Sequence, residues 1–131
     1  MERARADFHV VGLQDHAAMR RPIALQRQDE PLEGTGRIER IDLSTGKVER
    51  VLDTVDGHKL KGPNDLVFDK AGNLYFTDLG KTYSTHRDTG GIYFMAAGSD
   101  VVQELDYNQI SPNGIGLSPD EKTVYFADTM T

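Results

Sequence analysis

Hydrophobic residues recur in short runs along the chain from residue 37 onward. Each run is rich in aromatic and β-branched residues, and Gly, Asp, Asn or Pro separates it from the next. Such runs are typical of β-strands joined by tight turns, and no convincing helix interrupts them. The pattern therefore predicts an all-β fold. The predicted strands are residues 37–41, 47–52, 66–69, 74–78, 91–95, 101–105, 115–117 and 123–127.

One stretch of the sequence occurs twice. Residues 62–68, Gly-Pro-Asn-Asp-Leu-Val-Phe, return as residues 111–117, Ser-Pro-Asn-Gly-Ile-Gly-Leu, and each copy runs on to Tyr-Phe-x-Asp. Asn64 and Asn113 are 49 residues apart and the two final aspartates are 50 apart, so the copies differ by one inserted residue. The first two predicted strands also match residues 92–106 at offsets of 53 to 54. The repeating unit therefore contains four strands.

Four strands in about 50 residues are typical of one blade of a β-propeller, a small antiparallel sheet that stacks on the next blade. In this phase, residues 37–52 form the outer half of one blade, 64–106 a whole blade and 113–131 the inner half of a third. Closed propellers have about four to eight blades, so we expect residues 36–131 to be a fragment of a larger propeller. Residues 1–35 do not fit the repeat and are expected to form an irregular leader.

Composition and charge argue against several classes of function. The chain has no cysteine, so it forms no disulfide and no thiolate metal site. Its net charge of −6 argues against nucleic acid binding, which needs a basic face, and is compatible with a bound cation. No apolar run approaches the about 20 residues of a membrane-spanning helix, and residues 1–21 lack the apolar core of a secretory signal. We therefore expect a cytoplasmic protein without nucleic acid or membrane partners.

The repeated asparagines are the strongest candidates for chemistry. Asn64 and Asn113 each precede a predicted inner strand, and the inner strands of a propeller line its central channel. Two such side chains from neighbouring blades are expected to converge. Their neutral amide oxygens suit Ca²⁺, which collects about six to eight oxygen ligands. The alternative is that Pro-Asn-Asp and Pro-Asn-Gly only form turns.

The acidic residues near the asparagines have two interpretations each. Asp78 and Asp128 end equivalent strands, where they either line the channel or cap the following turn, and we favour the cap. Asp65 follows the first asparagine, whereas Gly114 takes its place in the second copy. Asp65 is either a carboxylate that supports the metal ligands from behind or a turn residue. No pair of histidines has metal-ligand spacing, and no serine has a neighbouring base.

Three linked motifs resemble the senescence-marker-protein/gluconolactonase/luciferin-regenerating-enzyme family, and the resemblance covers about residues 36–131. The motifs are residues 57–68, 74–78 and 112–122. The resemblance implies a six-bladed β-propeller that holds a divalent metal, most often Ca²⁺, in its central channel and hydrolyses a lactone. It further implies that Asn113 is a direct metal ligand and that Asn64 is a metal ligand or a contact for substrate and water.

The family also has two acidic metal ligands, on blades that precede and follow these motifs. Glu33 and Gly34 superficially resemble the first acidic motif, but Glu33 lies only 31 residues before Asn64, too close for a residue a full blade earlier. Gly62 stands where the sugar-lactonase branch has an arginine, which argues against a sugar-acid lactone. The run Gly-Gly-Ile-Tyr-Phe at residues 90–94 is more similar to bacterial lactonases of the drug-responsive type.

The resemblance thus implies part of a metal-dependent hydrolase that opens small-molecule lactone rings with metal-activated water. The alternative, from another class, is a non-catalytic β-propeller binding module or calcium-binding protein in which the asparagines only form turns. The two candidate ligands carry no charge to offset dehydration of the cation. We therefore expect the chain alone to bind metal weakly and to be inactive.

Overall fold

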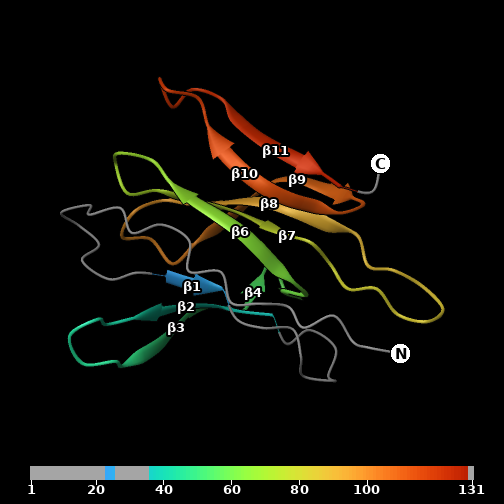
Figure 1. Ribbon diagram of the computed structural model, residues 1–131, viewed down its shortest axis with the longest axis horizontal. Coiled ribbons are helices and arrows are strands. Elements are labelled where there is room, and N and C mark those ends of the chain that lie inside the picture. The colour runs from blue at the N-terminus through green and yellow to red at the C-terminus, as the bar shows by residue number, and fades with distance from the viewer. Residues whose placement is uncertain (1–22, 26–35, 130–131) are drawn as a thin grey trace.

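The computed structural model describes residues 23–25 and 36–129, and every regular element in this part of the chain is a β-strand. The predicted all-β fold is confirmed for these residues. The strands are β1 (Ile23–Leu25), β2 (Ile38–Ile41), β3 (Val48–Leu52), β4 (Thr54–Val55), β5 (His58–Lys59), β6 (Pro63–Phe68), β7 (Leu74–Asp78), β8 (Gly90–Met95), β9 (Val102–Gln109), β10 (Pro112–Leu117) and β11 (Val124–Asp128). In Figure 1 the sheets β1–β3, β6–β9 and β10–β11 are stacked in chain order, and β4 pairs with β5 in a separate two-stranded sheet.

The central sheet is antiparallel throughout and has the strand order β6-β7-β8-β9. It confirms the predicted four-stranded unit over residues 64–106. A tight turn joins β6 to β7, in which the carboxylate of Asp69 accepts the backbone N–H of Asn73 at 2.9 Å and the side-chain amide of Asn73 at 2.8 Å. Gly72 lies in this turn at φ 86°, a conformation that glycine adopts without strain.

The hydrophobic core lies between the central sheet and the strands that precede it. Phe76 is fully buried and stacks on Tyr93 with their ring centroids 5.1 Å apart. Strand alternation places Leu74 and Phe76 on the same face of β7, as expected for a sheet that buries one side. The buried core residues are Ile38, Val55, Leu60, Leu66, Leu74, Phe76, Tyr93 and Met95.

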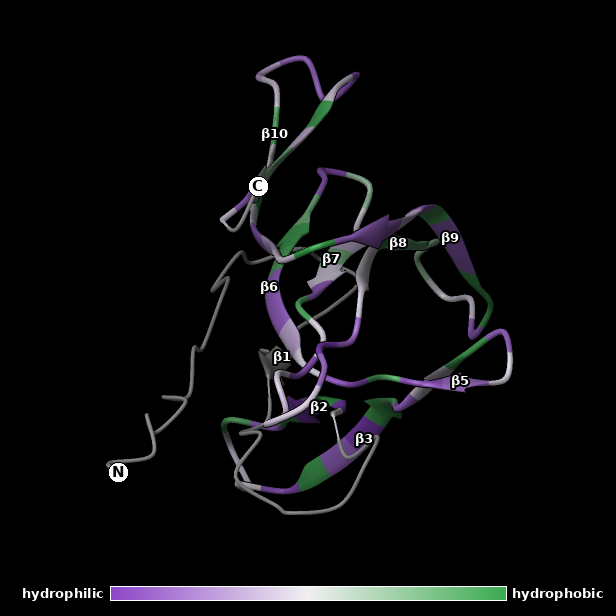
Figure 2. Ribbon diagram, turned by 90° about the vertical axis from the view of Figure 1, so that its right-hand side faces the viewer, coloured by the Kyte–Doolittle hydropathy of each residue, from purple (hydrophilic) through white to green (hydrophobic). Residues whose placement is uncertain are grey.

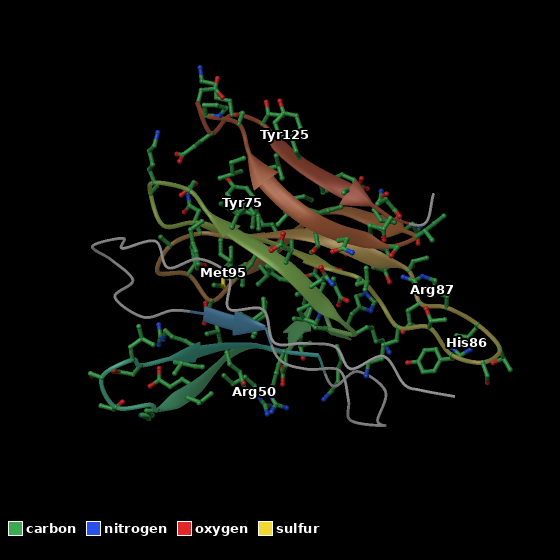
Figure 3. The ribbon with its side chains drawn as sticks, in the orientation of Figure 1. Arg50, Tyr75, His86, Arg87, Met95 and Tyr125 are labelled. Atoms are coloured by element: carbon green, nitrogen blue, oxygen red, sulfur yellow. The ribbon has the colours of Figure 1, made fainter. Side chains whose placement is uncertain are left out.

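The hairpin β10–β11 has the same strand pairing as β6–β7 but a different environment. Phe126 of β11 is 39% exposed, whereas its counterpart Phe76 of β7 is 0% exposed. Tyr125 is 62% exposed and is drawn at the upper, open side of the molecule in Figure 3. Figure 2 likewise shows the β10 hairpin at the end of the stack, beyond the central sheet. Tyr125 and Phe126 are consecutive and lie on opposite faces of β11, so in the part of the chain that the structure describes both faces of this hairpin leave an aromatic side chain exposed.

The expectation that residues 1–35 are irregular is wrong for Ile23–Leu25, which form β1 and pair with β2. The first sheet therefore has three strands, where residues 37–52 predicted two. A three-residue strand is too short for an alternating pattern, and its pairing with β2 is not visible in the local sequence. The other residues of the predicted leader lie outside the described residues.

Gly90, the first residue of β8, lies where β7, β8 and β10 approach one another closely. A Cβ built on Gly90 would lie 1.9 Å from the carbonyl oxygen of Asp78 and 2.9 Å from the ring of Pro112. Neither neighbour has room to yield, because one is backbone of β7 and the other begins β10. Only glycine lets β7, β8 and β10 meet at this point.

We predict that Gly90→Ala lowers the free energy of unfolding by about 2–4 kcal/mol, since the added methyl group has no space. Gly116→Ala is the matched control, because it also lies in a strand and a Cβ there meets nothing within 4 Å. Both substitutions are made in the chain produced with its flanking coding sequence, called the extended protein below. Urea unfolding measures the change in the free energy of unfolding for each. Equal effects of the two substitutions would contradict the packing argument.

Candidate functional site

Asn64 lies at an irregularity in the pairing of β6 with β7. Pro63 pairs with Asp78 and Leu66 pairs with Phe76, so Asn64 and Asp65 together oppose the single residue Thr77. This arrangement is a β-bulge, in which one extra residue bends the strand and turns a side chain away from the regular alternation. Bulges are common beside functional sites for this reason.

Asn113 lies in the equivalent bulge of β10. Pro112 pairs with Asp128 and Ile115 pairs with Phe126, so Asn113 and Gly114 oppose Ala127. Both asparagines are half-buried and lie within their strands, whereas the sequence placed them in front of the strands.

The structure brings the two bulges together, because β6 and β10 are the neighbouring strands of two stacked sheets (Figure 1). The hydroxyl of Thr77, opposite the first bulge, donates to the carbonyl oxygen of Asn113 at 2.6 Å. Among the described residues, neither the Asn64 nor the Asn113 side chain has a hydrogen-bond partner. Their amide oxygens are therefore available to a ligand.

Asp65, the predicted supporting carboxylate, bonds to backbone on both sides of this contact. Its Oδ1 accepts the N–H of Leu66 at 2.9 Å, and its Oδ2 accepts the N–H of Ile115 at 2.9 Å. The second bond crosses from β6 to β10. Asp65 thus joins the strand of one candidate ligand to the strand of the other.

Asp78 caps the following turn through Gly80, the role that the sequence favoured, and it also binds the segment before β6, which the sequence did not predict. It is 4% exposed, and its two carboxylate oxygens accept the backbone N–H groups of Lys61, Gly62 and Gly80 at 2.7, 2.7 and 2.9 Å. Asp128, its counterpart, accepts the N–H of Ile110 at 2.9 Å, the position equivalent to Lys61. Each aspartate therefore fastens the segment that leads into an asparagine-bearing strand.

Burial governs the electrostatics at this end of the sheet. Loss of water raises the pKa of the Asp78 carboxyl above its usual range, although its three backbone N–H donors lower it and Asp88 raises it further. Burial likewise raises the pKa of the Tyr93 hydroxyl, with a smaller contribution from the negative charge of Asp78. Neither group is a general base of ordinary pKa.

Arg87 joins the loop between β7 and β8 to the segment between β9 and β10 (Figure 3). Its guanidinium donates to the carbonyl oxygens of Ile110 at 2.8 Å and Leu79 at 3.1 Å, and also to the hydroxyl of Thr82. Tyr83 and His86 stack at the tip of the loop with ring centroids 4.4 Å apart. Arg87 thus ties the loop to the segment between β9 and β10, and His86 packs on Tyr83 within the loop.

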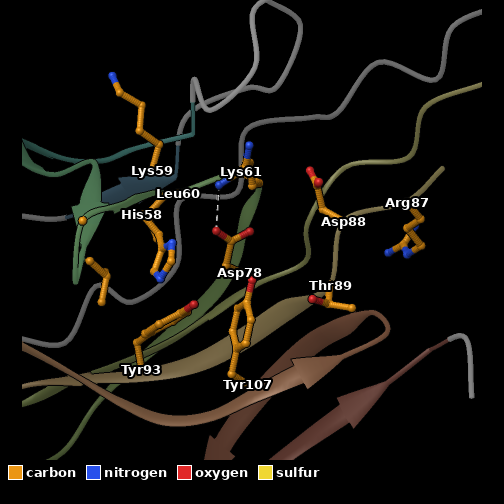
Figure 4. Close-up of a pocket in the computed structure, with 12 residues that line it drawn as sticks. His58, Lys59, Leu60, Lys61, Asp78, Arg87, Asp88, Thr89, Tyr93 and Tyr107 are labelled. Atoms are coloured by element: carbon orange, nitrogen blue, oxygen red, sulfur yellow. Dashed lines mark hydrogen bonds between the residues drawn. The ribbon is translucent and has the colours of Figure 1, made fainter.

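A cavity of about 620 Å³ opens beside this end of the sheet, and no sequence motif predicted it. Figure 4 shows Asp78 at its centre, with Tyr93 and Tyr107 below it. Basic side chains line it together with Asp88. The lining residues are Val55, Gly57, His58, Lys59, Leu60, Lys61, Asp78, Arg87, Asp88, Thr89, Tyr93 and Tyr107. Asn64 and Asn113 do not line this cavity, so it is separate from the paired asparagines.

The donors present fit part of a divalent cation site. Two amide oxygens from Asn64 and Asn113 are suitable Ca²⁺ ligands, but a full site needs about six to eight oxygens. The described residues contain no group of three or more His, Cys, Asp or Glu side chains that could hold a metal. They also contain no helix that is long and apolar enough to cross a membrane.

We predict that Asp78→Ala lowers the free energy of unfolding of the extended protein by about 3 kcal/mol or more, because two buried N–H groups and one part-buried N–H group lose their acceptor. Asp120→Ala is the control: Asp120 also accepts hydrogen bonds in a turn, from Ser118 and Lys122, but is exposed. We expect it to cost less than about 1 kcal/mol in the same urea titration. A loss for Asp78→Ala as small as that for Asp120→Ala would overturn the capping role.

The chain is similar in sequence to proteins named as lactonases. A 41% identity over 66 residues relates the chain to lactonase drp35 of Staphylococcus aureus, covering 50% of this chain and 20% of that protein. Gluconolactonase of Zymomonas mobilis is 29% identical over 103 residues, covering 73% of this chain and 29% of that protein. The chain thus spans less than a third of the length of these curated relatives.

Among solved structures, a gluconolactonase of Xanthomonas campestris superposes with a TM-score of 0.64 at 24% identity, over 83% of this chain and 37% of that one. This likeness shows a shared fold. The family model for the SMP-30/Gluconolactonase/LRE-like region matches residues 22–131, which include β1 and all later strands. The chain belongs to the SMP-30/gluconolactonase/LRE-like family.

Proposed function

We propose that this chain supplies two neutral ligands, Asn64 and Asn113, to the metal centre of a lactone hydrolase built as a six-bladed β-propeller. The observation that supports the proposal most directly is the pair of equivalent bulges in β6 and β10. Each bulge presents one asparagine, and the hydrogen bond from the N–H of Ile115 to the carboxylate of Asp65 joins the two strands.

The printed functions of the relatives support the substrate class. One relative is a gluconolactonase and another a lactonase, and both names describe hydrolysis of a cyclic ester. In that reaction water adds to the carbonyl carbon, the ring C–O bond breaks, and a hydroxy acid is released. We assign this chain to the same substrate class, a small-molecule lactone.

The bound metal, for which we propose Ca²⁺, would polarise the lactone carbonyl and make water a better nucleophile at neutral pH. The role of Asn64 and Asn113 is to bind the cation without cancelling its charge, since an amide oxygen is neutral. Asn64 also remains a contact for substrate or water. The general base is not among the residues assigned here, because the carboxylates of Asp65 and Asp78 are already occupied by backbone N–H groups.

A second candidate is a non-catalytic binding module or calcium-binding protein. It is favoured by one observation, the lack of an acidic metal-binding group among residues 23–25 and 36–129. The two candidates differ in what the flanking sequence must contain. A hydrolase requires acidic channel residues on neighbouring blades, whereas a binding module does not.

We predict that the extended protein hydrolyses a lactone and that a chelator abolishes this activity. Asn113→Ala should lower kcat/KM at least about tenfold, because the cation loses a ligand. Asn108→Ala is the matched control, since Asn108 is an exposed asparagine on β9. The rate of lactone hydrolysis, followed by the release of acid, is measured for the unsubstituted extended protein, for Asn113→Ala and for Asn108→Ala. Activity that persists in the presence of chelator would refute the proposal.

The 131-residue chain alone should show no lactone hydrolysis under the same conditions. Its two amide ligands offer no charge to offset the dehydration of a divalent cation. The exposed aromatic side chains of β11 should also cause the isolated chain to self-associate. Sedimentation velocity on the chain and on the extended protein compares their states, and a monodisperse isolated chain with full activity would contradict this expectation.

A further inference from the structure

Two side chains of β6 and β7 serve the bulges of both candidate ligand strands. Leu66 and Ile115 are equivalent residues, each directly following a bulge. The N–H groups of both donate to the same carboxylate, one to each oxygen of Asp65, at 2.9 Å in both cases. Asp65 therefore satisfies its own bulge with one oxygen and the neighbouring bulge with the other.

Thr77 completes the same contact through its hydroxyl group. The hydroxyl accepts the N–H of Asp65 at 3.2 Å and donates to the carbonyl oxygen of Asn113 at 2.6 Å. A bulge leaves backbone groups without their ladder partners, and such groups are costly when shielded from water. Asp65 and Thr77 together provide these partners on both strands.

The second copy of the repeat lacks side chains that could bond to the backbone groups of its own bulge. Gly114 stands at the position of Asp65, and Ala127 stands at the position of Thr77. A Cβ on Gly114 would lie 3.8 Å from Oδ2 of Asp65, so the position has room for a methyl group. A carboxylate there would instead place a second negative charge against Asp65. The β10 bulge thus depends on side chains of the preceding sheet.

We propose that Asp65, assisted by Thr77, is a positioning residue that fixes the β10 bulge and so places Asn113 relative to Asn64. This inference rests on the proposed metal site. Residues that orient metal ligands without touching the metal commonly change metal affinity about 10- to 100-fold when they are replaced. The carboxylate of Asp65 acts through backbone, so its loss shifts Asn113 while leaving the amide side chain itself intact.

The test measures Ca²⁺ binding to the extended protein by calorimetry and amide hydrogen exchange of residues 112–117 by mass spectrometry. We expect Asp65→Ala to raise the Kd for Ca²⁺ about tenfold or more and to accelerate exchange in this segment. Asp106→Ala is the matched control. Asp106 makes the same local bond, to the N–H of Tyr107 at 2.8 Å, but its other oxygen accepts only the nearby side chain of Gln109. It should leave both readouts unchanged within about twofold.

Thr77 provides a second pair of variants that does not depend on the folding of Asp65→Ala. Thr77→Val keeps the shape of the side chain but removes the hydroxyl, and it should weaken Ca²⁺ binding. Thr77→Ser restores the hydroxyl and should restore the Kd, which a purely structural loss of packing would not do.

The outcomes separate failure of the inference from failure of the proposed function. If Asn113→Ala weakens Ca²⁺ binding but Asp65→Ala and Thr77→Val do not, the positioning role is overturned and the metal site stands. If Asn113→Ala itself leaves the Kd unchanged, the metal site fails and the inference fails with it. Faster exchange in Asp65→Ala with an unchanged Kd would reduce Asp65 to a structural residue.

Discussion

The arrangement of the candidate site depends on how two adjacent β-bulges satisfy their backbone hydrogen bonds. A bulge turns an asparagine out of the regular alternation, but it also removes N–H and C=O groups from the ladder. Here the unpaired groups of β6 and β10 meet where two sheets stack, and Asp65 and Thr77 supply their partners. Two of these four bonds, from Ile115 to Asp65 and from Thr77 to Asn113, also link β10 to the central sheet. The same side chains therefore stabilise the contact between the sheets and place the asparagines.

The neighbouring aspartates extend this principle to the segments that lead into the bulges. Asp78 accepts two backbone N–H groups just before β6 and a third just after β7, and Asp128 binds the equivalent segment before β10. Their carboxylates are used by the fold, because each accepts backbone N–H groups beside an asparagine-bearing strand. In the proposed cation site the neutral amides contribute oxygen donors, and we propose that the negative charge comes from other residues.

Much of the fold could be predicted from the sequence because its signals are local. Runs of aromatic and β-branched residues between turn residues gave the all-β class and the four strands of the central sheet. The duplicated Pro-Asn motif likewise identified Asn64 and Asn113 as equivalent. The bulges escaped prediction because Pro and Asn are typical turn residues, and a bulge exists only relative to the residue opposite it.

The remaining features depend on contacts between distant segments. The bond from Ile115 to Asp65 joins residues 50 positions apart, and it requires β6 and β10 to be neighbours. The cavity beside Asp78 is lined by residues of the β4–β5 region, the β7–β8 loop and β9, so no single sequence motif predicts it. β1 is three residues long and owes its assignment to pairing with β2. The absence of an aspartate at Gly114 is visible in the sequence, but its meaning appears only beside Asp65.

We propose that the paired bulges present two asparagines to one cation, and a crystal structure of the extended protein grown with Ca²⁺ would show this contact. We expect one Ca²⁺ with the side-chain oxygens of Asn64 and Asn113 both at about 2.3–2.6 Å. A cation bound elsewhere, with the two amides turned toward protein hydrogen-bond partners, would rule out the shared site.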